Sequence, residues 1–270
     1  MSNKSNNSGS NTLMGYFAGA AIIVALLTGV LIYTQLMGNP ANFEGGDVVK
    51  GHPTNFLGIF HRGGFIVPLL LAVNIIVILV SIERFISMKA AQGKGSTTAF
   101  IHAVRNAMGK NDLAGAIAIC DKQQGSLANV VRSGLTRYQI VKGNDKLTRD
   151  EKKTAIEKEL EEATSLELPM LSRNLVVIAT CVSIGTLIGL IGTVFGMIRA
   201  FAALANAGAP DTAALATGIS EALVNTASGI VASTLAVIAY NYFSNRVDSM
   251  THSMDEASYS IVSNFQANHE

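Results

Sequence analysis

The sequence predicts an all-α membrane protein with four transmembrane helices. Its 270 residues are 49% hydrophobic and only 14% charged, whereas an average soluble domain is roughly 25% charged. The mean hydropathy is +0.36. Four long stretches carry no charge or a single one, and the sequence has no β-rich run of any length. These observations exclude a disordered chain and argue against an ordinary soluble enzyme.

The first two spans are predicted in the N-terminal third. A bilayer core of about 30 Å needs about 20 apolar residues. Residues 14–37 carry no charge over 24 positions, so we expect a retained helix rather than a cleaved signal peptide, whose apolar core is about 7–15 residues long. The Ser- and Asn-rich residues 1–13 are expected to be a disordered tail. Residues 63–82 are also uncharged, and the second transmembrane helix is predicted over 63–88.

The last two spans are predicted to form a hairpin over residues 174–245. Residues 174–198 carry no charge, and residues 212–245 carry a single one, Glu221. The segment between them, NAGAPDT, is rich in the turn-forming residues Asn, Gly and Pro. We therefore expect a long antiparallel helical pair that extends into a helical cytoplasmic domain.

That cytoplasmic domain is predicted over residues 89–173. Candidate helices follow capping residues, and the helix that begins near Thr148 has acidic residues in its first turn, as the helix dipole favours. Residues 246–270 are expected to form an amphipathic helix that continues the fourth span, because apolar side chains recur there at heptad spacing.

The basic residues predict the orientation of the spans. Residues 83–173 contain 15 of the 20 Lys and Arg residues, and segments rich in these residues stay in the cytoplasm. Because the number of spans is even, both termini are expected in the cytoplasm. The loop over residues 38–62 is then expected on the outer side of the membrane.

Several functional classes find no support in the sequence. A net charge of +1 provides no basic field that could hold nucleic acid. Cys120 and Cys181 lack partners at zinc-ligand spacing, and no nucleotide-binding loop, HExxH or GxSxG motif occurs. We therefore expect neither an enzyme nor a bound metal or cofactor.

Small and hydroxyl-bearing residues recur along the hairpin helices at helical spacing. Thr193 falls on a stripe of small residues in the third span, and such stripes allow two helices to approach closely. The alternative is that each Thr hydroxyl only bonds the carbonyl four residues earlier in its own helix. The glycines expected to pack the helices are Gly185, Gly189, Gly192, Gly196 and Gly229.

The fourth span contains Glu221, the one acid well inside a predicted span. A charge at the bilayer centre costs roughly 2.5–3.5 kcal/mol, so Glu221 indicates a function, a partner or a protonated carboxyl. Thr226 lies about 140° away on an ideal helix and should face a different neighbour. Arg199, near the outer turn, is expected to extend to the interface as an anchor, with pairing to Asp211 as the alternative.

Polar stripes on both hairpin helices favour a hydrated core that several copies of the chain share in a homo-oligomeric ring. No ring of positive charge or filter loop indicates a wide aqueous channel. Protons need only hydroxyls, waters and a carboxyl, so a proton pathway fits better than a solute pathway. A solute transporter would also be expected to show an internal repeat, which the sequence lacks.

Two motifs in the hairpin resemble the MotA/TolQ/ExbB proton channel family. They are GTVFGMIRAF at 192–201 and GISEALVNTASGIVASTLAVIAYN at 218–241. The ExbB and TolQ branch is the most similar. The resemblance covers residues 175–245 specifically. It extends more weakly to the earlier span, which ends in IERF, and to the helical insert that follows.

The resemblance implies an inner-membrane motor subunit driven by the proton motive force. ExbB-like proteins form a pentamer around the transmembrane helices of an ExbD-like dimer, and the complex energises a TonB-like protein that drives transport across the outer membrane. The proton-carrying membrane Asp would belong to the ExbD-like partner. Thr193, Thr226 and Glu221 of this chain would line the proton route, and residues 38–62 would form a periplasmic loop.

Other functions share the same physical pattern. A TolQ-like role in the envelope and a gliding or flagellar stator role stay open, as does a membrane scaffold that conducts no protons. The sequence also departs from the family in two ways. Typical ExbB and TolQ proteins have three spans and lack the one at 14–37, and Arg199 stands where an uncharged residue is expected.

Overall fold

The structure is a computed structural model, and it describes residues 7–49, 51–205 and 211–267, with side chains from residue 19 onward. The described residues are helical almost throughout and contain no strand beyond an isolated bridge between Phe43 and Pro53. The predicted all-α class is therefore confirmed. Four helical stretches of the described chain are long and apolar enough to cross a membrane, as the sequence predicts.

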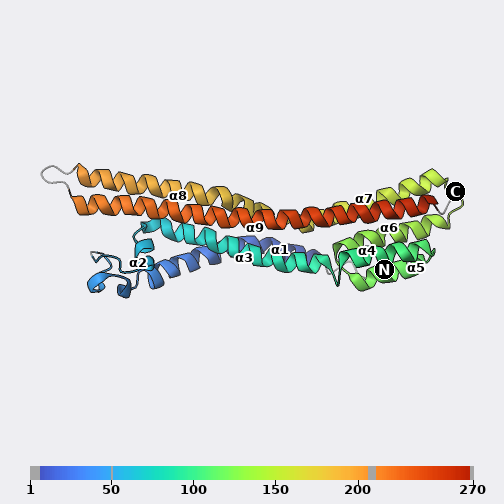
Figure 1. Ribbon diagram of the computed structural model, residues 1–270, viewed down its shortest axis with the longest axis horizontal. Coiled ribbons are helices and arrows are strands. Elements are labelled where there is room, and N and C mark those ends of the chain that lie inside the picture. The colour runs from blue at the N-terminus through green and yellow to red at the C-terminus, as the bar shows by residue number, and fades with distance from the viewer. Residues whose placement is uncertain (1–6, 50, 206–210, 268–270) are drawn as a thin grey trace. The chain divides into compact units, whose positions relative to one another are not determined.

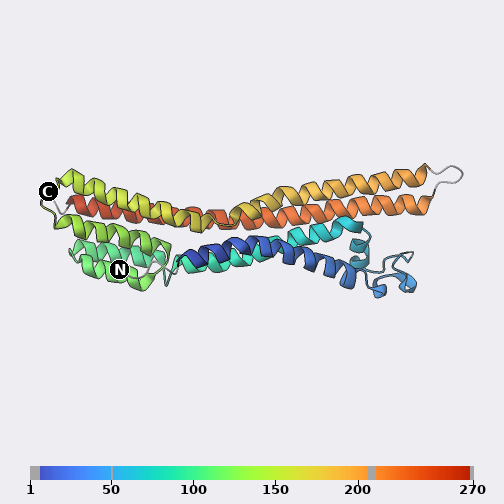
Figure 2. The same ribbon diagram turned by 180° about the vertical axis from the view of Figure 1, so that it is seen from behind.

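The chain divides into two compact units (Figures 1 and 2). The first unit comprises Met1–Ile82 and Asn174–Asn241, and the second comprises Glu83–Arg173 and Tyr242–Glu270. The first unit contains helix α1 (Asn7–Leu31) with its π-helical continuation η1 (Ile32–Met37), most of the apolar part of α3 (Val67–Gln92), α8 (Leu175–Leu204) and the first part of α9 (Thr212–Ala267).

Helix α1 begins earlier than the sequence predicts. Residues 1–13 are predicted to be a disordered tail, but the helix starts at Asn7, and residues 1–6 lie outside the described residues. Extending a helix that the apolar span has already nucleated costs little per residue. The polar Ser and Asn residues can therefore continue the helix. Most of the predicted turn at 206–212 also lies outside the described residues.

Helix α1 crosses α3 at Gly29. A Cβ atom at Gly29 would lie 2.8 Å from Pro68 O and 3.2 Å from Ala72 N. The two backbones are thus in direct contact, which only glycine allows. Pro68 is tolerated because it lies in the first turn of α3, where a backbone N–H has no partner within the helix.

The predicted loop over 38–62 is a compact substructure built around Asn42. The buried Asn42 side chain donates to Leu36 O at 2.8 Å and Met37 O at 2.9 Å, and it accepts from Asn55 Nδ2 at 2.9 Å. These bonds tie the end of η1 to the loop. The short elements of this segment are η2 (Pro40–Asn42), η3 (Glu44–Gly46), α2 (Phe56–His61) and η4 (Gly64–Ile66).

An aromatic stack holds α2 against η1. The His61 ring stacks on Tyr33 with centroids 4.5 Å apart and meets the edge of Phe43 at 5.6 Å. The Tyr33 hydroxyl donates to His61 O at 3.2 Å. Arg62 closes the loop by donating to Gly51 O at 2.6 Å and to Val49 O at 3.0 Å. The loop is therefore fixed at both ends.

The second unit is a helical bundle. Thr148 and Glu151 form a capping box that starts α7, which satisfies N–H groups of the first turn. Tyr138 packs edge-on against Phe265 at 5.2 Å, and both side chains are fully buried. The helices are α4 (Thr97–Gly109), α5 (Leu113–Gln123), α6 (Ser126–Lys142), α7 (Arg149–Ser172) and the last part of α9.

The loop over 38–62 should lose order in acid. Burial and the neighbouring Arg62 cation lower the pKa of His61 from its ordinary 6.5. Because the folded loop favours the neutral ring, its stability is fully present above about pH 6.5 and falls as the pH drops through the lowered value. We expect the amide protons of Glu44 and Thr54, which bond across the loop, to exchange faster at about pH 5 than intrinsic rates explain.

The matched control is His61→Phe, which keeps a ring between Tyr33 and Phe43 but cannot titrate. In this variant, lowering the pH to about 5 should not speed the exchange of the Glu44 and Thr54 amide protons beyond their intrinsic rates. If wild type and His61→Phe lose protection equally, His61 is not the titrating group.

Candidate functional site

Helices α8 and α9 lie side by side in antiparallel contact within the first unit (Figures 1 and 2). Their backbones touch along a line of glycines, which we call the glycine seam. A Cβ atom at Gly189 would lie 3.1 Å from the Cα of Gly229, and one at Gly196 would lie 2.7 Å from Ala222 N. The seam contains each glycine that the sequence predicts for helix packing, namely Gly185, Gly189, Gly192, Gly196 and Gly229.

Two hydroxyl pairs bridge the helices beside the glycine seam. Thr193 bonds Thr226, and the Thr186 and Ser233 hydroxyl oxygens are 2.7 Å apart. The pairs exist because glycines bring the two backbones close enough for short side chains to meet. Each pair is separated from the other by seven residues on either helix, which is about 10.5 Å along the axis.

The Thr193–Thr226 pair has more hydrogen-bond contacts than protons. Besides contacting each other, the Thr193 hydroxyl lies 3.1 Å from Gly189 O and the Thr226 hydroxyl lies 3.2 Å from Ala222 O. Each hydroxyl has one proton to donate, so two protons serve three contacts. Thr193 donates to Thr226 in one arrangement, and Thr226 donates to Thr193 in the other. The pair can therefore reverse the direction of its hydrogen bond without moving a heavy atom.

Glu221 lies on another face of α9 and is held in an ion pair. Arg199 Nη1 lies 2.8 Å from Glu221 Oε1 and 2.7 Å from Oε2. The Glu221 side chain is 4% exposed, whereas that of Arg199 is 54% exposed. The sequence predicts that Arg199 reaches the interface as an anchor, or else pairs with Asp211. The structure instead directs it across the hairpin to Glu221, because an opposite charge offsets the cost of burying the carboxylate.

The short helix η4, which leads into α3, closes over this ion pair. Gly64 has φ +74°, and its Cα faces the Glu221 carboxylate so closely that a Cβ atom there would lie 3.1 Å from Cδ. Phe65 lies under the Arg199 guanidinium at 5.9 Å and meets Phe195 edge-on at 5.5 Å. The left-handed backbone at Gly64 suits glycine. The ion pair thus joins three elements, η4, α8 and α9.

Asn225 makes a second connection on the same face of α9, one turn beyond Glu221. It is fully buried and donates from Nδ2 to Gly63 O at 2.9 Å. Its Oδ1 atom is buried with no hydrogen-bond partner in the described part of the chain. Asn225 therefore fastens the segment before α3 to the hairpin.

Sequence reasoning finds part of this site. The structure brings Thr193 and Thr226 together and places Glu221 apart from them. The helical repeat alone predicts this separation, because Glu221 and Thr226 differ by about 140° around α9. The sequence does not predict the contacts of Arg199 and Asn225. For Arg199 a signal was available, because a basic residue in one hairpin helix is a candidate partner for the single acid in the other. No group of three or more His, Cys, Asp or Glu residues suited to a metal ion occurs among the described residues.

Comparisons with known proteins match the same part of the chain. Residues 122–256, half of the chain, match the model of the MotA/TolQ/ExbB proton channel family. The Tol-Pal system protein TolQ of Pseudomonas aeruginosa is 32% identical over 138 residues, and a protein named as an ExbB homolog in Methanothermobacter thermautotrophicus is 28% identical over 199 residues. The biopolymer transport protein ExbB of Salmonella typhimurium is 34% identical over 85 residues.

These matches are partial on both sides. They cover 51%, 72% and 32% of this chain, and 58%, 66% and 35% of the TolQ, ExbB homolog and ExbB relatives respectively. In each case less than two thirds of the relative's own length is matched. Similarity alone therefore does not assign to this chain the activity or the partners of the full-length relatives.

The ion pair predicts unequal effects of removing its two partners. Arg199→Gln leaves the nearly buried Glu221 carboxylate without a counter-charge and should lower the free energy of unfolding by about 3 kcal/mol. Glu221→Gln leaves a half-exposed guanidinium and should cost less. Denaturant unfolding of the purified protein in detergent measures both values.

The double variant Arg199→Gln/Glu221→Gln completes a double-mutant cycle. It should be more stable than Arg199→Gln alone, because it leaves no unpaired charge buried. Additive effects of the two substitutions would show that the contact does not couple the residues.

Proposed function

Because the chain belongs to the MotA/TolQ/ExbB proton channel family, we propose that it is an ExbB-like subunit of a bacterial inner-membrane motor driven by the proton motive force. Several copies, five by resemblance, surround the membrane helices of an ExbD-like dimer. The complex energises a TonB-like protein for transport across the outer membrane. The chain supplies a proton route and a rigid frame rather than catalytic groups.

The Thr193–Thr226 pair is the observation that carries this proposal. A hydroxyl that accepts one hydrogen bond and donates another relays a proton when the direction of both bonds reverses. The pair has two donor patterns with the same heavy-atom positions, and each pattern ends on a backbone carbonyl that only accepts. A water or an acid outside the pair must therefore deliver a proton to one hydroxyl, and another group must take the proton that the second hydroxyl releases.

The acid that takes up the proton belongs to the partner. Glu221 is engaged by Arg199 and lies away from the hydroxyl pair, so in this conformation it does not complete a relay with Thr193 and Thr226. We assign to Glu221 the support of the route through the ion pair that fixes the hairpin to η4. A membrane Asp on the ExbD-like partner would face the hydroxyl pair instead.

The proposed orientation has both termini in the cytoplasm and the compact loop over 38–62 in the periplasm. The excess of Lys and Arg in residues 83–173 supports it. The helical second unit would then be cytoplasmic.

A TolQ-like role is the second candidate, because TolQ and ExbB relatives match this chain at similar identity, 32% and 34%. The two roles share the same proton route and differ in the protein that they energise. A scaffold that conducts no protons is the remaining alternative, and it gives the hydroxyl pairs only a packing role.

Removing the hydroxyls should reduce proton flux. We expect the double variant Thr193→Val/Thr226→Val, with its partner subunit in liposomes, to take up protons at least about tenfold more slowly, because each Val keeps the shape of Thr but relays no proton. A pH-sensitive dye inside the liposomes measures the rate under an imposed membrane potential.

The matched control is Thr234→Val, since Thr234 also lies on α9 but is exposed. Among the described residues its hydroxyl bonds only Ile230 O in its own helix, at 2.8 Å. Its flux should equal that of wild type. Normal flux in the Thr193/Thr226 double variant would favour the scaffold reading.

Complementation should separate the two motor roles. Expressed with its own partner subunit, the chain should restore uptake through a TonB-dependent outer-membrane transporter in a strain that lacks ExbB. It should not repair the envelope defect of a strain that lacks TolQ. The opposite pattern would assign it the TolQ-like role.

A further inference from the structure

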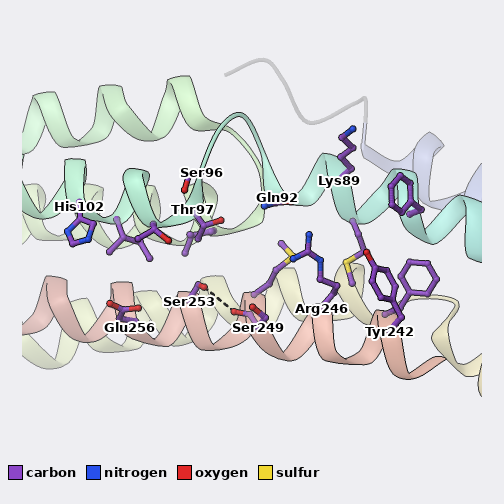
Figure 3. A pocket seen from close by; sticks show the side chains of 17 residues that line it. Lys89, Gln92, Ser96, Thr97, His102, Tyr242, Arg246, Ser249, Ser253 and Glu256 are labelled. Carbon is purple, nitrogen blue, oxygen red and sulfur yellow. Dashed lines mark hydrogen bonds between the residues drawn. The ribbon is translucent and has the colours of Figure 1, made fainter. Parts of the chain in front are cut away.

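The second unit contains a cavity that the proton route does not use. Its volume is about 580 Å³, within the range of about 300–1,000 Å³ that is typical of sites for small ligands. The cavity lies between the end of α3, the start of α4 and residues 242–256 of α9, with one contact from α6. Figure 3 shows it from close by.

The central charge of this cavity is the cation of Arg246. Arg246 extends from α9 towards Gln92 at the end of α3, whereas Lys89 extends from α3 on the side away from α9 (Figure 3). Neither cation forms an ion pair within the described residues. The one carboxylate in the lining is Glu256, which lies beside Arg105 at 3.8 Å. The middle of the cavity is therefore positively charged.

Hydroxyl groups line the cavity beside this cation. Ser96 and Thr97 face the cavity from the start of α4, and Ser249 lies opposite on α9 (Figure 3). Ser96 precedes α4, and its hydroxyl oxygen accepts no capping bond from the helix. The hydroxyl can therefore turn towards a ligand and donate its proton there. A guanidinium with several nearby hydroxyl donors suits the oxygen atoms of a phosphate group.

The two ends of the cavity differ in polarity. Tyr242 lies at one end, and His102 and Glu256 lie at the other (Figure 3). Tyr242 is 50% exposed, and Phe85, which also lines the cavity, is 55% exposed. In sequence, Phe85 lies three residues beyond Ile82, where the uncharged stretch of α3 ends, and Tyr242 lies near the end of the apolar stretch of α9. An aromatic surface at this position meets lipid chains at the bilayer interface.

We propose that this cavity binds an acidic phospholipid of the cytoplasmic leaflet. The phosphodiester lies against Arg246 and the hydroxyls of Ser96, Thr97 and Ser249, and the acyl chains pass over Tyr242 and Phe85 towards the bilayer. Basic pockets near the cytoplasmic ends of membrane helices hold anionic headgroups in the same way. The inference uses the proposed orientation but does not depend on proton conduction.

Native mass spectrometry of the purified full-length protein tests the proposal. The protein is titrated with phosphatidylglycerol or phosphatidylcholine in detergent. We expect phosphatidylglycerol to bind more tightly, and Arg246→Gln to weaken its binding at least about tenfold, as the loss of a charge-assisted hydrogen bond requires. The matched control is Arg132→Gln, because Arg132 is exposed in the same unit, pairs with Asp121 and lies outside the cavity.

Three results would overturn the proposal. They are equal binding of the two lipids, equal phosphatidylglycerol binding by Arg246→Gln and Arg132→Gln, and binding of soluble glycerol 1-phosphate as tight as that of the lipid. Circular dichroism and thermal unfolding establish that both variants are folded. Proton uptake is measured separately, so a failure of lipid binding is distinguishable from a failure of the proton route.

Discussion

The direct contact of two helix backbones along the glycine seam is the constraint on which the candidate site depends. Short hydroxyl side chains on separate helices meet only when the backbones are this close. A Cβ atom at Gly196 or Gly229 would lie 2.7 Å from a backbone atom of the other helix. Any side chain there would push the helices apart and separate Thr193 from Thr226. The glycines therefore determine the chemistry of the site although they contribute no polar group to it.

The two faces of α9 make different kinds of contact. Its hydroxyl face carries Thr226 beside α8, and its other face carries Glu221 and Asn225, which hold the segment before α3. Charged and amide groups give stronger and more directional contacts than hydroxyls. They suit the attachment of a third element. The hydroxyl contacts can change direction without moving a heavy atom, as the proposed relay requires.

The sequence predicts the features that depend on one-dimensional spacing. Uncharged runs of bilayer length locate the spans, and helical periodicity separates Glu221 from Thr226. Prediction from the sequence fails where a contact depends on how separate elements pack together. Arg199 and Glu221 are 22 residues apart on antiparallel helices, and their alignment depends on the seam. The loop over 38–62 has no periodic pattern, so nothing in its sequence marks Asn42 as the residue that organises it.

The hydroxyl pairs of one chain do not form a continuous line of hydrogen bonds along the helices. The pairs Thr186–Ser233 and Thr193–Thr226 stand about 10.5 Å apart along the helices, while a hydrogen bond between hydroxyls spans about 2.7–2.8 Å. A proton therefore needs further groups between the pairs. The residues between them on the seam, Gly189 and Gly229, have no side chain to offer. In the proposed route, water bridges this interval, and the acid of the proposed partner subunit takes up the proton.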